Sequence, residues 1–99
     1  MTMVTSRTRF QKKIEQRLGC WGKRRGTIAS KVERAADDDE KAVLCAELAK
    51  LRALEAEGRR CLSVVETAGA AAWTRLQNDF IERWERADRA AEAIWSRVS

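Results

Sequence analysis

The chain contains no histidine, no tyrosine and no proline, and its 99 residues include only five glycines. Without histidine, a Cys-His zinc site is impossible and the most common general acid–base side chain is missing. There is also no glycine-rich phosphate loop, so we predict a protein that is not an enzyme and uses no cofactor or metal ion. A sheet protein needs several turns built from Gly, Pro, Asn and Asp. The only asparagine is Asn78, so the composition favours an all-α fold.

Cysteines and long apolar runs are scarce too. Cys20, Cys45 and Cys61 are separated by 25 and 16 residues, spacings that match no zinc or redox motif, and their odd number argues against a disulfide framework. We interpret them as small apolar residues in a reducing compartment. No stretch reaches the about 18 apolar residues of a membrane span, and residues 1–6 lack the apolar core of a signal peptide. We expect a cytoplasmic location, with the membrane periphery as the alternative.

Helix-forming sequence fills the chain in three segments of similar length. Ala, Arg, Glu and Leu dominate the composition, and all four favour helices. Apolar residues recur at helical spacing over 7–35, 39–67 and 70–97, and a chain of this size makes one domain at most. Helices of similar length suit an up-down-up arrangement. We predict one all-α domain over residues 1–99, an antiparallel three-helix bundle with coiled-coil-like packing.

Two breaks separate these segments. The run Asp37-Asp38-Asp39-Glu40 combines capping side chains with charges that suit a helix N-terminus, so the first turn is predicted at about 36–39. The second break is less marked, and Gly69 is expected to cap the C-terminal end of the second helix. The alternative is continuous helix through 67–70. That would give a long helical hairpin that dimerises to cover its apolar face.

Gly19, Gly22 and Gly26 lie inside the first segment, at a cost of about 0.5–1 kcal/mol each relative to alanine. Trp21 and Ile28 nevertheless stay in phase, which favours an unbroken helix over a break at the glycines. One explanation for the glycines is a close contact with another backbone.

The third segment contains an eleven-residue repeat, in which Trp73, Trp84 and Trp95 occupy equivalent positions. Eleven residues make three helical turns with a drift of only about 20°, so the three indoles are predicted to lie on one line. This face is predicted to pack as core on the first two helices; the alternatives are an apolar face for a membrane surface or for a partner helix. Its residues are Trp73, Leu76, Phe80, Trp84, Ala87, Ala91, Ile94, Trp95 and Val98.

Positive charge is concentrated at the start of the chain. Residues 1–36 hold ten Lys or Arg and two Glu, a net charge of +8, whereas residues 37–68 have a net charge of −3. Such a segment attracts nucleic-acid phosphates and anionic lipid headgroups. The candidate anion-binding residues are Arg17, Lys23, Arg24 and Arg25. No nucleic-acid recognition motif is present, and the favoured interpretation is that these cations pair with the acidic second segment in the fold.

The order of these features resembles a known group of proteins. Phe10 and Trp21 precede an acidic turn and a leucine-rich second segment, and Ala71-Ala72-Trp73, Leu76 and Trp84 follow. This pattern resembles the small coiled-coil proteins of bacteria, including a stress-associated group in cyanobacteria, over roughly residues 10–98. The resemblance implies a cytoplasmic or membrane-peripheral helical protein without known catalytic activity. This chain is basic where those proteins tend to be acidic, so no shared partner is implied.

The sequence thus favours a non-enzymatic helical interaction or scaffold module that self-associates or binds another helical protein. Two alternatives remain. The amphipathic eleven-residue-repeat helix could bind anionic membrane surfaces, or the basic first helix could bind nucleic acid without sequence specificity. Eleven-residue periodicity also occurs in helices that lie on lipid surfaces, whereas no motif supports nucleic-acid binding.

Overall fold

Three α-helices follow one another in the computed structural model, which describes residues 6–99. Helix α1 spans Ser6–Arg34, α2 spans Asp38–Thr67 and α3 spans Ala70–Val98, and all three pairs of helices are in contact. The predicted antiparallel three-helix bundle is therefore confirmed. The alternative of a long hairpin is wrong, because the chain leaves the helix between α2 and α3. Residues 1–5 lie outside the described residues. They belong to the predicted domain and to the stretch in which the sequence predicts no signal peptide.

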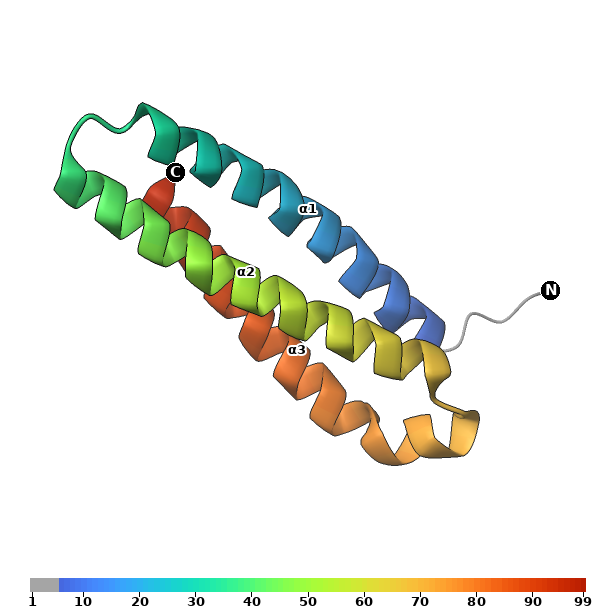
Figure 1. Cartoon of the computed structure of the whole chain (residues 1–99). Helices are drawn as coiled ribbons and strands as arrows, with labels where there is room; N and C mark the ends of the chain where they lie inside the picture. Colours follow the sequence, from blue (N-terminus) through green and yellow to red (C-terminus); the bar gives the residue numbers. More distant parts are fainter. Residues whose placement is uncertain (1–5) are drawn as a thin grey trace.

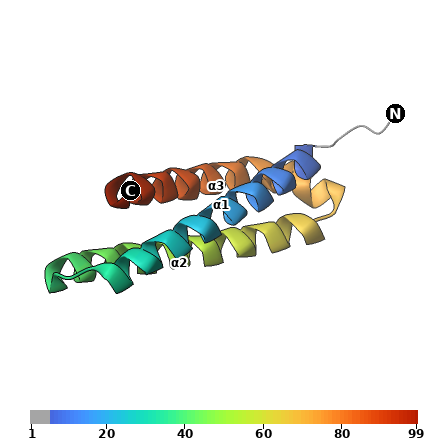
Figure 2. The ribbon, with the colours of Figure 1, turned by 90° about the horizontal axis from the view of Figure 1, so that it is seen from above.

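Figure 1 shows the helices running up, down and up, so that the chain's C-terminal end lies beside the turn between α1 and α2. The bundle is elongated, with extents of 55 × 26 × 19 Å. Seen from above, α1 overlies the line between α2 and α3 (Figure 2). Within residues 6–99, no helix is long and apolar enough to cross a bilayer.

The first helix continues unbroken through its three glycines, as predicted. The proposed reason for these glycines is wrong, however. A Cβ atom built on Gly19 or Gly26 would meet no atom within 4 Å, and one on Gly22 would meet only the Arg25 guanidinium at 3.9 Å. These three glycines therefore do not serve to bring α1 closer to another helix of the bundle.

The two turns use different capping groups. Asp37 has an extended backbone and its carboxylate accepts a hydrogen bond from the Asp39 amide at 3.0 Å, so it caps α2 as its sequence context predicted. The second turn corrects the expectation for Gly69. Ala68 ends α2, and Gly69, at φ −73° and ψ 166°, is the N-cap of α3. A left-handed residue is unnecessary because the chain passes from α2 into α3 through two extended residues.

Polar contacts hold the bundle together at both ends. Near the α2–α3 turn, Arg7 of α1 donates to the Ala68 carbonyl oxygen, and the Trp73 indole N–H donates to Ser6 Oγ at 3.0 Å. At the opposite end, Lys31 Nζ donates to the Val98 carbonyl oxygen at 2.5 Å. A cation at that position also suits the negative end of the α3 dipole.

The core lies along the axis where the three apolar faces meet. Ile14, Trp21 and Ile28 of α1 and Val65 of α2 are fully buried, and Leu51 of α2 is nearly so. Ile14, Trp21 and Ile28 are seven residues apart, a heptad-like spacing. The apolar faces of α2 and α3 complete a single cluster around them, which positions the surface features described next.

Candidate functional site

Two tryptophans and a glycine form the centre of the bundle. The indole rings of Trp21 and Trp84 are stacked, with centroids 5.0 Å apart and planes 19° from parallel. A Cβ on Gly58 would lie 2.7 Å from Leu18 Cδ2 and 3.2 Å from Trp84 Cζ3. Gly58 thus lets α2 approach the stacked rings closely. The sequence gives no signal of this role, because Leu18 and Trp84 are distant from Gly58 in the chain.

Beside this centre, a groove opens between α2 and α3, which we name the α2–α3 groove. One part of it is a cavity of about 200 Å³ whose wall includes Cys61, Val64, Phe80 and Trp84. Further along, Ala53, Leu54, Ala90, Ala93 and Ile94 line a wider opening of about 550 Å³. Most of the residues that line the groove are apolar. The charged residues in its lining are Glu57, Arg60, Arg83, Lys50 and Arg97.

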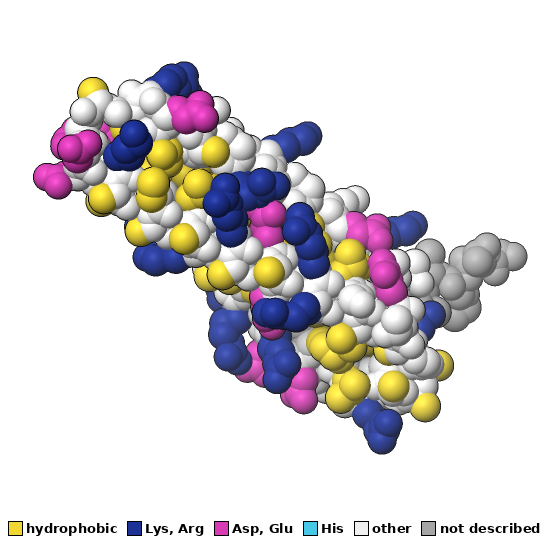
Figure 3. Space-filling model, in the orientation of Figure 1, with side chains coloured by type: hydrophobic (Ala, Val, Ile, Leu, Met, Phe, Trp, Pro, Cys, Tyr) yellow, Lys and Arg dark blue, Asp and Glu magenta, His cyan; other side chains and the backbone are white. Residues whose placement is uncertain are grey.

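The solvent-facing side of α2 continues this apolar surface. Five exposed alanines repeat at spacings of four and three residues and so share one face of the helix. We name it the alanine face: Ala42, Ala46, Ala49, Ala53 and Ala56. Val43 and Val64 are exposed as well, by 61% and 40%. Figure 3 shows hydrophobic side chains gathered along α2 and around the α2–α3 turn, with Lys and Arg side chains between them.

The predicted apolar face of α3 is largely buried in the core. Trp73, Trp84, Ala87, Ala91, Ile94 and Val98 are buried, and Phe80 and Trp95 are half-buried. Trp73 also packs against Phe10, with ring centroids 5.5 Å apart. Leu76 differs from this pattern because 39% of it remains exposed. It lies about 60° around the helix from Trp73, at an edge that the neighbouring helices do not cover.

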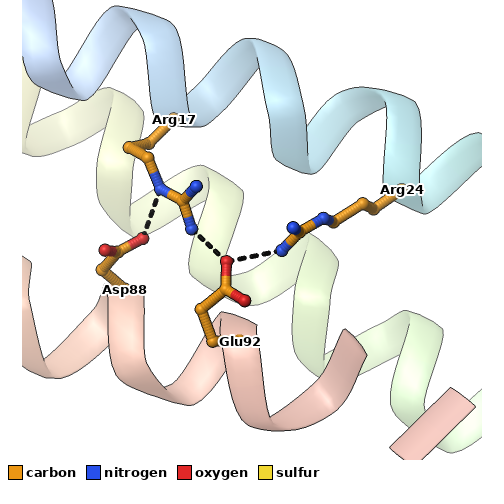
Figure 4. Close-up of polar contacts among 4 residues, drawn as sticks. All are labelled: Arg17, Arg24, Asp88 and Glu92. Atoms are coloured by element: carbon orange, nitrogen blue, oxygen red, sulfur yellow. Dashed lines mark hydrogen bonds and ion pairs between the residues drawn. The ribbon is translucent and has the colours of Figure 1, made fainter. Parts of the chain in front are cut away.

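The other side of α3 faces α1 and is closed by charged groups. Arg17 bonds to Asp88 at 2.8 Å and to Glu92, and Arg24 reaches the same Glu92 oxygen at 2.6 Å (Figure 4). The hydrogen bonds from Arg17 and Arg24 lower the pKa of Glu92, and the bond to Glu92 raises the pKa of Arg17. Arg24 also lies over the Trp95 ring, 5.1 Å from its centroid. We name this cluster the α1–α3 seam: Arg17, Arg24, Asp88, Glu92 and Trp95.

A third arginine of α1 faces α2. Arg25 Nε lies 2.8 Å from Glu55, whose side chain is only 4% exposed and which Arg59 also approaches at 3.6 Å. Three of the four candidate anion-binding residues, Arg17, Arg24 and Arg25, are therefore occupied by carboxylates of the chain, and only Lys23 is exposed. The predicted pairing of α1 with the acidic second segment holds for Arg25. Arg17 and Arg24 pair with α3 instead.

One ion pair crosses the α2–α3 groove, near the end where α3 terminates. Arg97 donates to both carboxylate oxygens of Glu47, at 2.9 and 3.2 Å, and Lys50 lies 3.5 Å from the same carboxylate. The hydrogen bonds from Arg97 lower the pKa of Glu47. The bidentate geometry fixes the relative position of the two helices there.

The three cysteines are free and lie apart on the structure. Burial raises the pKa of the Cys61 thiol, and Glu57 adds to that effect. A thiol held in its neutral form is a poor nucleophile and a poor metal ligand. Among the described residues, no three His, Cys, Asp or Glu side chains lie together as a metal site would require.

No protein-family model, no curated protein and no solved structure matches the chain. The resemblance to small bacterial coiled-coil proteins therefore stays a prediction.

Proposed function

We propose that this protein is a non-enzymatic helical interaction module that self-associates through the alanine face of α2 and the adjoining α2–α3 groove. The observation that carries this proposal is the line of exposed alanines on α2, which lies beside the mainly apolar lining of the α2–α3 groove. Between Ala42 and Ala56, the solvent-facing line of α2 holds only alanine. Contiguous apolar surface on a small protein typically marks an interaction site.

The side chains on this surface favour a helix as the partner. Alanine lets two helix backbones approach more closely than larger residues do, because the distance between helix axes depends on the side chains in the contact. The exposed valines at either end, Val43 and Val64, add larger apolar groups. The lining of the groove by Leu54 and Ile94 would accept side chains from the same partner.

The order of charges along α2 favours a second copy of the chain, in antiparallel orientation. Asp38 and Arg60 lie eleven residues on either side of Ala49, the middle residue of the alanine face. A two-fold axis at Ala49 would bring each Asp38 next to Arg60 of the other copy, because both residues lie within about 20° of the line through Ala49. Such a contact is self-complementary. Arg60 pairs with Glu57 at the surface, at 2.5 Å, a contact that is easily exchanged.

Light scattering over a range of concentrations tests self-association. We expect the mass to rise from the monomer value of 11.3 kDa toward twice that value as the concentration increases. Ala49→Glu should keep the protein monomeric at every concentration, because it buries a charge at the centre of the contact. Asn78→Glu, on an exposed part of α3, is the matched control and should dimerise like the parent. A parent protein that stays monomeric to millimolar concentration would overturn the proposal.

Disulfide cross-linking tests the orientation, in a background in which the three native cysteines are replaced by serine. Ala49→Cys should form a covalent dimer with itself, because the axis brings the two Cα atoms within the reach of a disulfide. Ala42→Cys should not cross-link to itself but should cross-link to Ala56→Cys when the two are mixed. Self-cross-linking of all three variants would show a parallel pairing and contradict the antiparallel contact.

A further inference from the structure

The basic residues of α1 divide into two sets that the sequence did not distinguish. One set is bound inside the molecule: Arg7, Arg17, Arg24, Arg25 and Lys31 all donate to acceptors on α2, α3 or the turn between them. The other set points outward, and we name it the outer basic face: Arg9, Lys12, Lys13, Lys23 and Arg34. All five are exposed and, in residues 6–99, none forms an ion pair with a carboxylate.

From this division we infer that the outer basic face binds the phosphate backbone of a duplex nucleic acid. The inference goes beyond the proposed self-association and uses a different surface. Lys12, Lys23 and Arg34 are spaced by eleven residues, so they lie nearly on one line along the helix. At 1.5 Å per residue the line is about 33 Å long, close to one turn of duplex DNA, about 34–36 Å. Arg9 and Lys13 widen the cationic area near its start.

The remaining residues of this face match a polar, charged partner. Gly19 and Gly26 are exposed and have no atom within 4 Å of a Cβ position, so they leave the helix surface bare between the cations. Thr27 and Ser30 are exposed hydroxyl residues on the same side. The carboxylates of α1, Glu15 and Glu33, lie about 60–80° to one side of the line, on the side toward α2. The cations spread toward the other side.

A bilayer surface fits this face less well than a duplex. Helices that bind membranes insert apolar side chains below the headgroups, whereas the apolar residues of α1 are buried in the core. Sequence-independent binding of nucleic acid needs only cations positioned against phosphates. The outer basic face offers such cations without any apolar contact.

The test is the affinity for a labelled mixed-sequence duplex of 20 base pairs, measured by fluorescence anisotropy from 20 to 200 mM NaCl. With three to five phosphates neutralised, the logarithm of the binding constant should fall with log[NaCl] with a slope of about −3 to −5. Lys12→Gln combined with Lys23→Gln and Arg34→Gln should weaken binding at least about tenfold at 20 mM NaCl and reduce the slope by about 3.

The matched control replaces three exposed arginines of α3, Arg75, Arg86 and Arg89, by glutamine. It changes the net charge equally and should weaken binding less than about threefold. Circular dichroism checks that both variants keep the helical fold. Equal losses in the two variants would show a net-charge effect and overturn the inference. So would the absence of duplex binding at 20 mM NaCl, or tighter binding to vesicles containing 30% anionic lipid than to the duplex.

Discussion

Along one side, α3 is joined to α1 by charged groups, whereas along its other side it leaves small apolar openings against α2. The α1–α3 seam holds two arginines, two carboxylates and an indole in mutual contact. The α2–α3 groove is crossed by the ion pair of Glu47 with Arg97 and is lined mainly by alanine and larger apolar residues. The charged seam satisfies its own groups and offers little to a partner. The groove and the alanine face keep apolar surface in water, which is why we place association there.

Tryptophan substitutions separate the core from the seam and should have the largest effects. Trp84 is 2% exposed and stacks on Trp21, so Trp84→Ala should lower the free energy of unfolding by about 3–5 kcal/mol. Trp95 is half-buried under Arg24. Trp95→Ala should therefore lower the free energy of unfolding by only about 1–2 kcal/mol. Urea unfolding followed by far-ultraviolet circular dichroism measures both. A loss below about 1 kcal/mol for Trp84→Ala would contradict its place at the centre of the core.

Glycine substitutions distinguish the interior of the bundle from its outer surface. Gly58→Ala should destabilise the fold by about 1–3 kcal/mol, because the added methyl group overlaps Leu18 and pushes against Trp84. Gly26→Ala is the control in an open position of α1 and should stabilise by about 0.5–1 kcal/mol through helix propensity. Thermal unfolding of the two variants beside the parent provides the comparison. If Gly58→Ala left the stability unchanged, α2 would be able to shift away from the stacked rings without loss of free energy of unfolding.

The helices and their buried faces could be predicted because they depend on local periodicity. The heptad-like spacing in α1, the acidic cap at Asp37 and the eleven-residue tryptophan repeat are each readable within about thirty residues. Trp73 and Trp84 are accordingly buried. The exposure of Leu76 shows the limit of this reasoning. Periodicity gives the direction in which a side chain points, but the width that neighbouring helices cover depends on how they pack.

The closely packed glycine and the ion-pair partners could not be predicted for a related reason. Gly58 matters because of Leu18 and Trp84, which lie 40 and 26 residues away in the chain. Many pairings were open to the arginines of α1, since all three segments contain carboxylates. Only the bundle geometry decides that Arg17 and Arg24 reach Glu92 while Lys23 stays exposed.

Acid titration should weaken the α1–α3 seam, with the smallest effect of the three predictions. Because Arg17 and Arg24 lower the pKa of Glu92, its carboxylate stabilises the fold above the unfolded-state pKa of about 4.3. This contribution is lost as the pH falls below that value toward the lower pKa of the folded state. Glu92 is 45% exposed, so the contribution at pH 7 is about 1 kcal/mol or less.

The free energy of unfolding of Glu92→Gln, measured by urea denaturation between pH 7 and pH 3, reports this contribution directly. The variant should be less stable than the parent at pH 7, and the difference should vanish toward pH 3, because protonated Glu92 and glutamine are both neutral. Glu85→Gln is the control, since Glu85 is exposed on α3 and takes part in none of the ion pairs among residues 6–99. A difference for Glu92→Gln that persists at pH 3 would point to packing of the side chain rather than to its charge.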